Sequence, residues 1–183
     1  MLRRLLRCLP ALVLACLAVL AFTGPRQAAA EGTVHPTDET VVRQIHRYQQ
    51  ATWRWQSLMG VPRTPRSGAA EKDPSIRFKL WVRNRWHRRA LRARRMAVKP
   101  PHHAGWLCIH RYEGAWHDPS PPYYGGLQMD IGFQQTYGRE LLRRKGTANN
   151  WTPLEQMWVA ERAHRSGRGY YPWPNTARYC GLI

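Results

Sequence analysis

The segment from residue 37 to residue 60 carries apolar side chains at intervals of three and four, which is the spacing of one face of an α-helix. Thr37, Asp38 and Glu39 supply a cap and an acidic first turn, and Gly60 supplies an end. The sequence therefore predicts an amphipathic helix, whose apolar face consists of Val41, Val42, Ile45, Tyr48, Thr52, Trp55 and Met59.

A second helix is predicted after a linker near residues 61–73, where prolines and small polar residues interrupt the periodicity. Asp73-Pro74-Ser75 can start this helix, and Pro100-Pro101 ends it because a residue before proline is disfavoured in helical geometry. Residues 31–100 are thus predicted to be a basic helical arm, in which the tryptophans pack on neighbouring structure and the arginines bind an anionic partner. The helix carries eight arginines among its other positions, and its apolar residues are Phe78, Trp81, Val82, Trp86 and Leu91.

Residues 101–183 differ from the arm in composition, because tryptophan, tyrosine and glycine become frequent from Trp106 onward. A turn at residues 119–122 and a glycine-rich segment at residues 123–128, expected to be extended, interrupt a series of short helices. The fold class predicted for this region is α+β and mostly helical. The helices are expected to end at Glu113 and to cover residues 130–138, 137–145 and 152–164, the last with Thr152 and Glu155 as a capping box.

Residues 1–30 have the layout of a secretory signal peptide. Arginines near the start precede an apolar run, residues 9–22, and small residues follow at positions 28–30. The run is shorter than the roughly 20 residues that a helix needs to span a bilayer. The sequence therefore predicts cleavage near Glu31 and a secreted or wall-associated protein, with an uncleaved membrane anchor as the less favoured alternative.

The chain is strongly basic, with 29 Lys and Arg against 11 Asp and Glu and a formal net charge of +18. Such a charge predicts a polyanionic partner. For an exported protein, anionic wall polymers or a membrane surface are the expected partners of the basic arm. Nucleic acid is the common alternative, and it would be bound in a strongly salt-dependent way.

The four cysteines divide evenly between the signal region and the rest of the chain. Cys108 and Cys180 remain after the predicted cleavage. A pair of cysteines in an exported protein predicts one disulfide. The alternative is two separate buried thiols.

The stretch from Trp106 to Trp116, WLCIHRYEGAW, followed by YYGGLQ at residues 123–128, resembles the catalytic domain of resuscitation-promoting factors. Those domains, and the related actinobacterial transglycosylase-like proteins, are small relatives of lysozyme. The likeness covers about 75 residues, from Trp106 to Ile183, and includes Trp173-Pro174 and Cys180. It implies a lysozyme-like fold and Glu113 as the catalytic acid. Two features depart from the family: Tyr112 stands where a cysteine is frequent, and Glu-Gly-Ala replaces the usual Glu-Ser-Gly-Gly.

A general acid must stay protonated, and an apolar aromatic surface such as Trp106 or Trp116 disfavours the ionised form of a nearby carboxyl group. Most glycosidases use two carboxylates, and Asp118 and Asp130 are the candidate partners of Glu113. Other acids of the region are set aside, because Glu155 is assigned to a cap and Glu140 and Glu161 have arginine neighbours in amphipathic patterns. The resemblance implies instead a scheme with one glutamate, in which the substrate's N-acetyl group supports the oxocarbenium-like centre.

The sugar cleft is predicted to be lined by three aromatic residues and an amide. Aromatic faces pack on sugar rings, and an amide offers a donor and an acceptor to N-acetyl groups. Core packing is the alternative for the tyrosines. The histidines lack a metal-ligand spacing, so no metal or other cofactor is expected. The predicted cleft residues are Trp116, Tyr123, Tyr124 and Gln128.

The function that these features predict is a secreted glycosidase, a lytic transglycosylase or muramidase, that cleaves the linkage between N-acetylmuramic acid and N-acetylglucosamine in peptidoglycan. The alternative is a non-catalytic protein that binds the cell wall through its basic arm. Specific nucleic-acid binding would explain the charge but neither the signal peptide nor the motif between Trp106 and Gln128.

Overall fold

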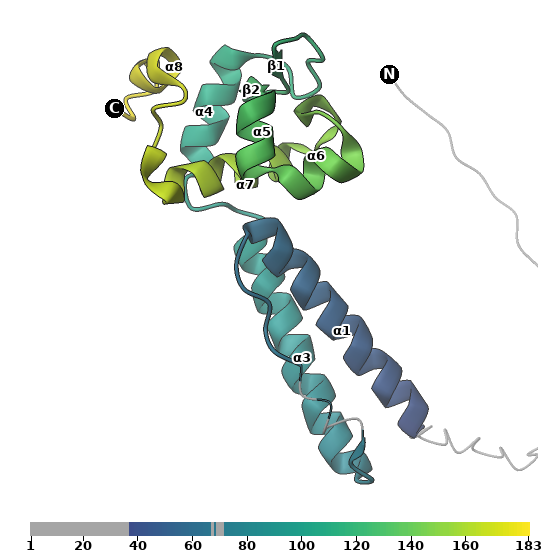
Figure 1. Ribbon diagram of the computed structural model, residues 1–183. Helices are drawn as coiled ribbons and strands as arrows, with labels where there is room; N and C mark the ends of the chain where they lie inside the picture. The colour runs from purple at the N-terminus through teal and green to yellow at the C-terminus, as the bar shows by residue number, and fades with distance from the viewer. Residues whose placement is uncertain (1–36, 67, 69–71) are drawn as a thin grey trace, which may run out of the picture. The chain divides into compact units, whose positions relative to one another are not determined.

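The computed structural model describes residues 37–66, 68 and 72–183. The predicted signal peptide, together with the alternative of a membrane anchor at residues 9–22, lies outside these residues. The described chain is mostly helical with one small sheet, which confirms the predicted α+β class (Figure 1). Within the described ranges, no helix is both long and apolar enough to cross a membrane.

The two predicted arm helices are α1, Asp38–Met59, and α3, Ile76–Ala97, which lie side by side in Figure 1. The side chain of Thr37 accepts the backbone N–H of Thr40, and Gly60 ends α1 in the left-handed conformation. The hydroxyl of Ser75 accepts the backbone N–H of Phe78 and caps α3. The helix ends are therefore fixed by the local signals that predicted them.

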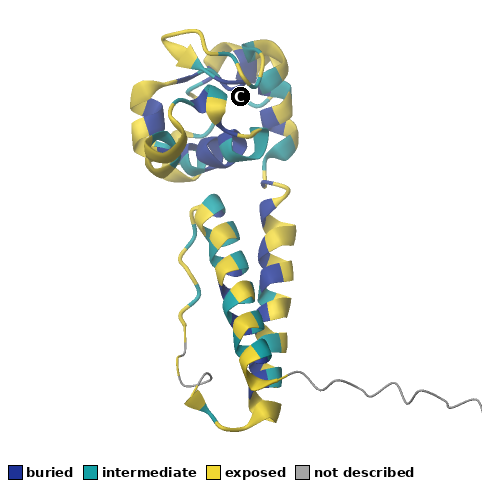
Figure 2. Ribbon diagram, turned by 90° about the vertical axis from the view of Figure 1, so that its right-hand side faces the viewer, coloured by how far each residue is buried: buried dark blue, intermediate teal, exposed yellow. Residues whose placement is uncertain are grey.

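The buried face of α3 combines two large apolar residues with a row of alanines. Val82 and Trp86 pack against Val41 and Ile45 of α1, but the buried residues then continue as alanines, at positions 90, 93 and 97 (Figure 2). These small side chains let a helix pack closely on its neighbours. The predicted packing of the tryptophans is confirmed for Trp86 and was wrong for Trp81, which lies on the exposed side with Phe78 and Leu91.

The C-terminal region contains a two-stranded antiparallel sheet in which Tyr123 pairs with Asp130 and Tyr124 with Met129. The predicted extended segment is therefore shorter than expected, because residues 125–128 form the turn between the strands. The predicted helices are present, and the structure adds α8, which was not predicted. The elements are α4 His103–Glu113, β1 Tyr123–Tyr124, β2 Met129–Asp130, α5 Ile131–Tyr137, α6 Arg139–Lys145, a 3-10 turn Ala148–Asn150, α7 Pro153–Ala163, a π turn His164–Arg168 and α8 Pro174–Tyr179.

The core of this region is rich in tryptophan, and each indole N–H in it has an acceptor. Trp151 donates to the Gly146 carbonyl at 2.8 Å, and Trp173 donates to the Leu127 carbonyl at 2.6 Å. Buried polar groups without a partner would be costly, and none occurs among the described side chains. The aromatic core of this domain is thus held in one arrangement by directional bonds as well as by packing.

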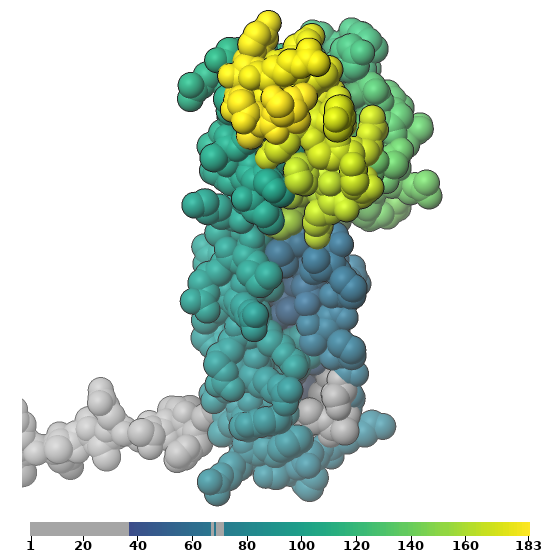
Figure 3. Space-filling model, turned by 90° about the vertical axis from the view of Figure 1, so that its left-hand side faces the viewer, coloured from purple at the N-terminus to yellow at the C-terminus, as the bar shows by residue number. Residues whose placement is uncertain are grey.

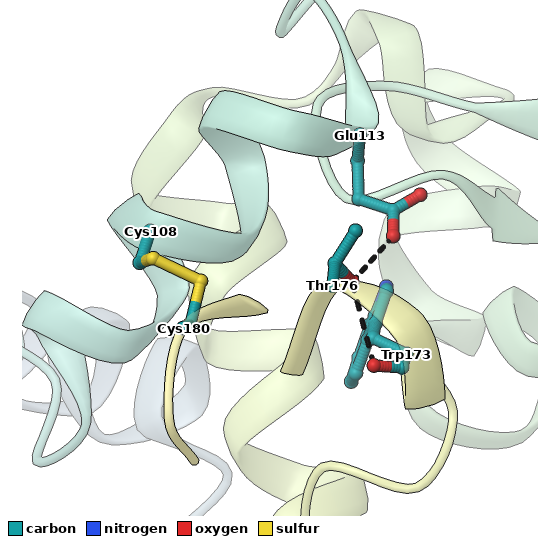
Figure 4. Close-up of a disulfide and its surroundings, with 5 residues drawn as sticks. All are labelled: Cys108, Glu113, Trp173, Thr176 and Cys180. Atoms are coloured by element: carbon teal, nitrogen blue, oxygen red, sulfur yellow. Dashed lines mark hydrogen bonds between the residues drawn. A yellow bond between two sulfur atoms is a disulfide. The ribbon is translucent and has the colours of Figure 1, made fainter. Parts of the chain in front are cut away.

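Cys108 and Cys180 form the predicted disulfide, with 6.0 Å between their Cα atoms (Figure 4). Cys108 lies on α4, and Cys180 directly follows α8. The bond therefore ties together the helix that carries Glu113 and a helix about 70 residues further along the chain.

Glu161 differs most from its expected role, because it is completely buried. Its Oε1 atom accepts the backbone N–H of His102 at 2.8 Å and the indole N–H of Trp106 at 2.9 Å. His102 Nδ1 also lies 3.2 Å from the carboxylate. Glu161 of α7 thus fixes the beginning of α4, which no feature of its amphipathic pattern indicated.

Replacing Glu161 with glutamine is expected to lower the free energy of unfolding by about 2 kcal/mol, because a buried charge-assisted acceptor is lost. Urea unfolding followed by circular dichroism measures this loss. Glu140→Gln is the matched control, since Glu140 is exposed and its one ion pair among the described residues is with Arg143, and its effect should stay within about 0.5 kcal/mol. Equal stability of the two variants would contradict a structural role for Glu161.

The arm contacts the C-terminal region through α7. Trp158 packs in a cluster with Met59, Ala93 and Ala97, and its indole N–H donates to the Ala97 carbonyl at 2.7 Å. Arg162 donates to the Leu58 carbonyl at 2.7 Å. The Arg162 guanidinium of α7 thus lies at the C-terminal end of α1, where the last carbonyl groups have no partner within the helix. Burial, and then repulsion from Arg165, lowers the pKa of Arg162, although its ordinary value is so high that it stays charged.

Candidate active site

Glu113 is the last residue of α4, and the chain turns away at Gly114, whose φ of 144° strongly favours glycine. The half-buried carboxyl group of Glu113 points toward α8 (Figure 4). There the hydroxyl of Thr176 donates to Glu113 Oε1 at 2.7 Å. The candidate acid is thus held by a residue 63 positions later in the chain.

The Thr176 hydroxyl can serve both protonation states of Glu113. It lies 2.7 Å from the carboxyl group and 3.4 Å from the carbonyl oxygen of Trp173, and it has only one hydrogen to donate. It donates to Glu113 when the carboxyl group is ionised. When Glu113 is protonated, the same hydroxyl can accept a hydrogen bond from the carboxyl O–H and donate to the Trp173 carbonyl oxygen.

Glu113 lines one part of an open groove. A section of about 200 Å³ is bordered by Glu113, and an adjoining section of about 460 Å³ extends to Arg168. Tyr123, which is 50% exposed, offers a free aromatic face to both sections. The two sections adjoin each other and share four lining residues, which are Tyr123, Gln128, Pro172 and Trp173.

The aromatic residues predicted for the cleft divide between the groove and the interior. Tyr123 lines the groove, whereas Tyr124 packs against the core, as the alternative for the tyrosines anticipated. Trp116 does not line either section and instead stacks on His110, with ring centroids 3.9 Å apart. Trp106 lies in the core with its indole N–H on Glu161. The tryptophan that lines the groove with Glu113 is Trp173.

Gln128 lines both sections and has an unusual backbone, with a φ of 46° that non-glycine residues seldom adopt. Its amide nitrogen donates to Asp118 Oδ2 and to the Gly125 carbonyl, both at 3.0 Å. The predicted donor role toward a ligand is therefore taken up within the protein. The carbonyl oxygen accepts no hydrogen bond from the described residues, so Gln128 can accept one from a ligand.

The two candidate partner carboxylates have structural bonds. Hydrogen bonds from the side chain and backbone of Ser120, and then from Gln128, lower the pKa of Asp118. Asp118 is therefore ionised at neutral pH and cannot act as the proton donor. Asp130 caps α5 by accepting the backbone N–H of Phe133 at 2.7 Å, and it lines the larger section of the groove. Glu113 therefore remains the candidate acid.

The turn that carries Gln128 requires glycine at two positions. A Cβ atom at Gly125 would lie 2.5 Å from Gln156 Oε1, and one at Gly126 would lie 2.6 Å from the His110 ring. Gln156 also accepts the backbone N–H of Gly126 at 2.9 Å. The turn is therefore anchored on buried α7, which gives the groove a rigid wall.

Several groove residues have no counterpart in the sequence prediction. Thr176, Arg168 and Asn175 reach the site only because α8 and the preceding loop fold back toward α4. Among the described residues, no group of three or more His, Cys, Asp or Glu side chains is placed to hold a metal ion. Comparisons with models of protein families, with curated proteins and with solved structures found no match for this chain.

Proposed function

We propose that this protein cleaves the glycan strand of peptidoglycan, with Glu113 as the general acid. The observation that carries the proposal is a half-buried carboxyl group, held by Thr176, at the edge of a groove lined by aromatic and amide side chains. The likeness of residues 106–128 to the catalytic domain of resuscitation-promoting factors supports the same assignment. The bond cut is that between N-acetylmuramic acid and N-acetylglucosamine.

In the proposed reaction, Glu113 gives its proton to the glycosidic oxygen while the bond from this oxygen to the anomeric carbon breaks. The leaving sugar departs with a hydroxyl group, and the substrate's own N-acetyl oxygen supports the positive anomeric centre. Water, or the 6-hydroxyl of the same sugar, then adds to this centre and returns a proton to Glu113. Thr176 donates to the carboxylate between the two steps.

The groove also suits the charge of this substrate. Peptidoglycan carries carboxylates on its peptide stems, and Arg168 lines the larger section at a distance from Glu113 along the groove. In the described part of the chain, Arg168 forms no ion pair with an acidic side chain. Its guanidinium is therefore available to a stem carboxylate, while Tyr123 and Trp173 contact sugar rings.

Digestion of purified peptidoglycan by the chain beginning at residue 31 tests the proposal. Mass spectrometry should detect soluble muropeptides. Anhydro-muramyl ends would indicate attack by the 6-hydroxyl and a lytic transglycosylase, whereas reducing ends would indicate hydrolysis. Binding to the wall without release of fragments would contradict an enzyme and favour the alternative of a wall-binding protein.

Replacing Thr176 with valine is expected to lower kcat about 10- to 100-fold with little change in KM, because a hydrogen bond to a charged group is lost at the reacting acid and not at the sugar contacts. Initial rates of muropeptide release measure this effect. Thr176→Ser keeps the hydroxyl and should retain most activity. A valine variant with the wild-type rate would show that Glu113 needs no positioning by Thr176.

A further inference from the structure

The outer face of α3 is a continuous surface that the proposed reaction does not use. Its residues recur three or four positions apart, on the side of the helix opposite the buried Val82, Trp86 and Ala90. The surface of α3 is teal in Figure 3. We call this set the outer face: Arg77, Trp81, Arg85, Arg88, Leu91, Arg92 and Arg95, all of them exposed.

The arginines of α3 form no ion pair with the acidic side chains that the structure describes. The 22 residues of the helix include no Asp or Glu, and its one ion pair within the described residues joins Lys79 to Asp38. Burial, and then repulsion from Arg85, lowers the pKa of Arg89. The crowded arginines therefore repel one another in the free protein, and a dense array of negative charge would relieve this repulsion.

The outer face also exposes apolar rings, which distinguishes it from a purely electrostatic surface. Trp81 is 50% exposed, stacks on Phe78 with ring centroids 5.6 Å apart, and lies under the Arg85 guanidinium. Leu91 lies ten residues further along the helix and is exposed between Arg88 and Arg92. A soluble polyanion would neutralise the arginines but leave the aliphatic side chain in water. An anionic bilayer surface offers phosphates to arginine and the headgroup boundary to tryptophan and leucine.

We propose that the outer face of α3 binds the surface of an anionic lipid membrane. The arginines contact lipid phosphates, and Trp81 and Leu91 enter the boundary between headgroups and acyl chains. Because α1 packs on the opposite side, the face can lie flat on the surface over about 33 Å, the length of a 22-residue helix. This binding is independent of whether Glu113 cleaves peptidoglycan.

Sedimentation with sucrose-loaded vesicles tests the proposal on the chain beginning at residue 31, in 0.15 M salt. The wild type should bind vesicles of equal phosphatidylglycerol and phosphatidylcholine and should not bind phosphatidylcholine alone. Changing Arg85, Arg88 and Arg92 together to glutamine should weaken binding on the order of 100-fold. The matched control changes three exposed arginines outside α3, Arg139, Arg144 and Arg178, and should weaken it less than about threefold.

Trp81→Ala keeps the charge and should still weaken vesicle binding several-fold, with loss of the shift of tryptophan fluorescence to shorter wavelength on binding. Circular dichroism confirms that each variant is folded. Equal losses for the two triple variants would overturn the proposal, as would wild-type binding by Trp81→Ala. Tighter binding to single-stranded DNA or to polyphosphate than to vesicles of equal phosphate content would assign the face to a soluble polyanion instead. Glu113→Gln should bind vesicles as the wild type does.

Discussion

Peptidoglycan cleavage by Glu113→Gln is expected to be about 1000-fold slower than cleavage by the wild type, within the range attributed to general acid catalysis. Glutamine has nearly the same size and can still pair with the Thr176 hydroxyl, so the groove should keep its shape. The amide cannot supply the acid proton that the leaving oxygen needs. Initial rates of muropeptide release measure the loss, and sedimentation with insoluble peptidoglycan should show unchanged binding.

Asp118→Asn is the control that separates a mechanism with one carboxylate from one with two. Asp118 is ionised and already bonded to Ser120 and Gln128, so its role is to hold the turn beside Glu113. We expect a loss below about 10-fold, mostly through the position of Gln128. A loss as large as that of Glu113→Gln would make Asp118 a second catalytic carboxylate. Normal cleavage by Glu113→Gln would place the acid elsewhere.

The helices of this protein were predictable because their ends are encoded locally. Thr37, Gly60 and Thr152 each act within three or four residues of their own position, and the structure shows the bonds that these residue types predict. The buried face of α3 was not predictable in the same way. The helix carries apolar residues on two sides, and only the neighbour α1 decides which side is covered. Ala90 and Ala93, which complete the buried side, give a weak apolar signal.

The sequence also predicted only those side chains of the candidate site that belong to one short motif. The motif located Glu113, Tyr123 and Gln128, which belong to one short stretch of chain. Trp116 is equally close in sequence, but the turn after Glu113 places it against the ring of His110 and outside both sections of the groove. Thr176 could not be found from its neighbours, because its contact with Glu113 depends on the packing of α8 beside α4.

Loss of the disulfide is the largest stability effect that we expect. The bond between Cys108 and Cys180 spans 72 positions. Closing a loop of this length removes conformational entropy from the unfolded chain, which corresponds to about 4 kcal/mol in the chain-entropy model. The double variant Cys108→Ala, Cys180→Ala should therefore unfold at a clearly lower urea concentration. Wild type in dithiothreitol should unfold near the same concentration, whereas dithiothreitol should not affect the variant.

The effect on activity should be smaller than the effect on stability, because packing also holds α8 against α4. Trp173, directly before α8, donates to Leu127 and contacts Trp106, and neither contact requires the disulfide. At temperatures where the double variant remains folded, Thr176 should still reach Glu113 and muropeptide release should fall less than about 10-fold. A loss as complete as that of Glu113→Gln in the folded variant would mean that the bond itself sets the distance from α4 to α8. Stability within about 1 kcal/mol of the wild type would contradict the entropic role of the bond.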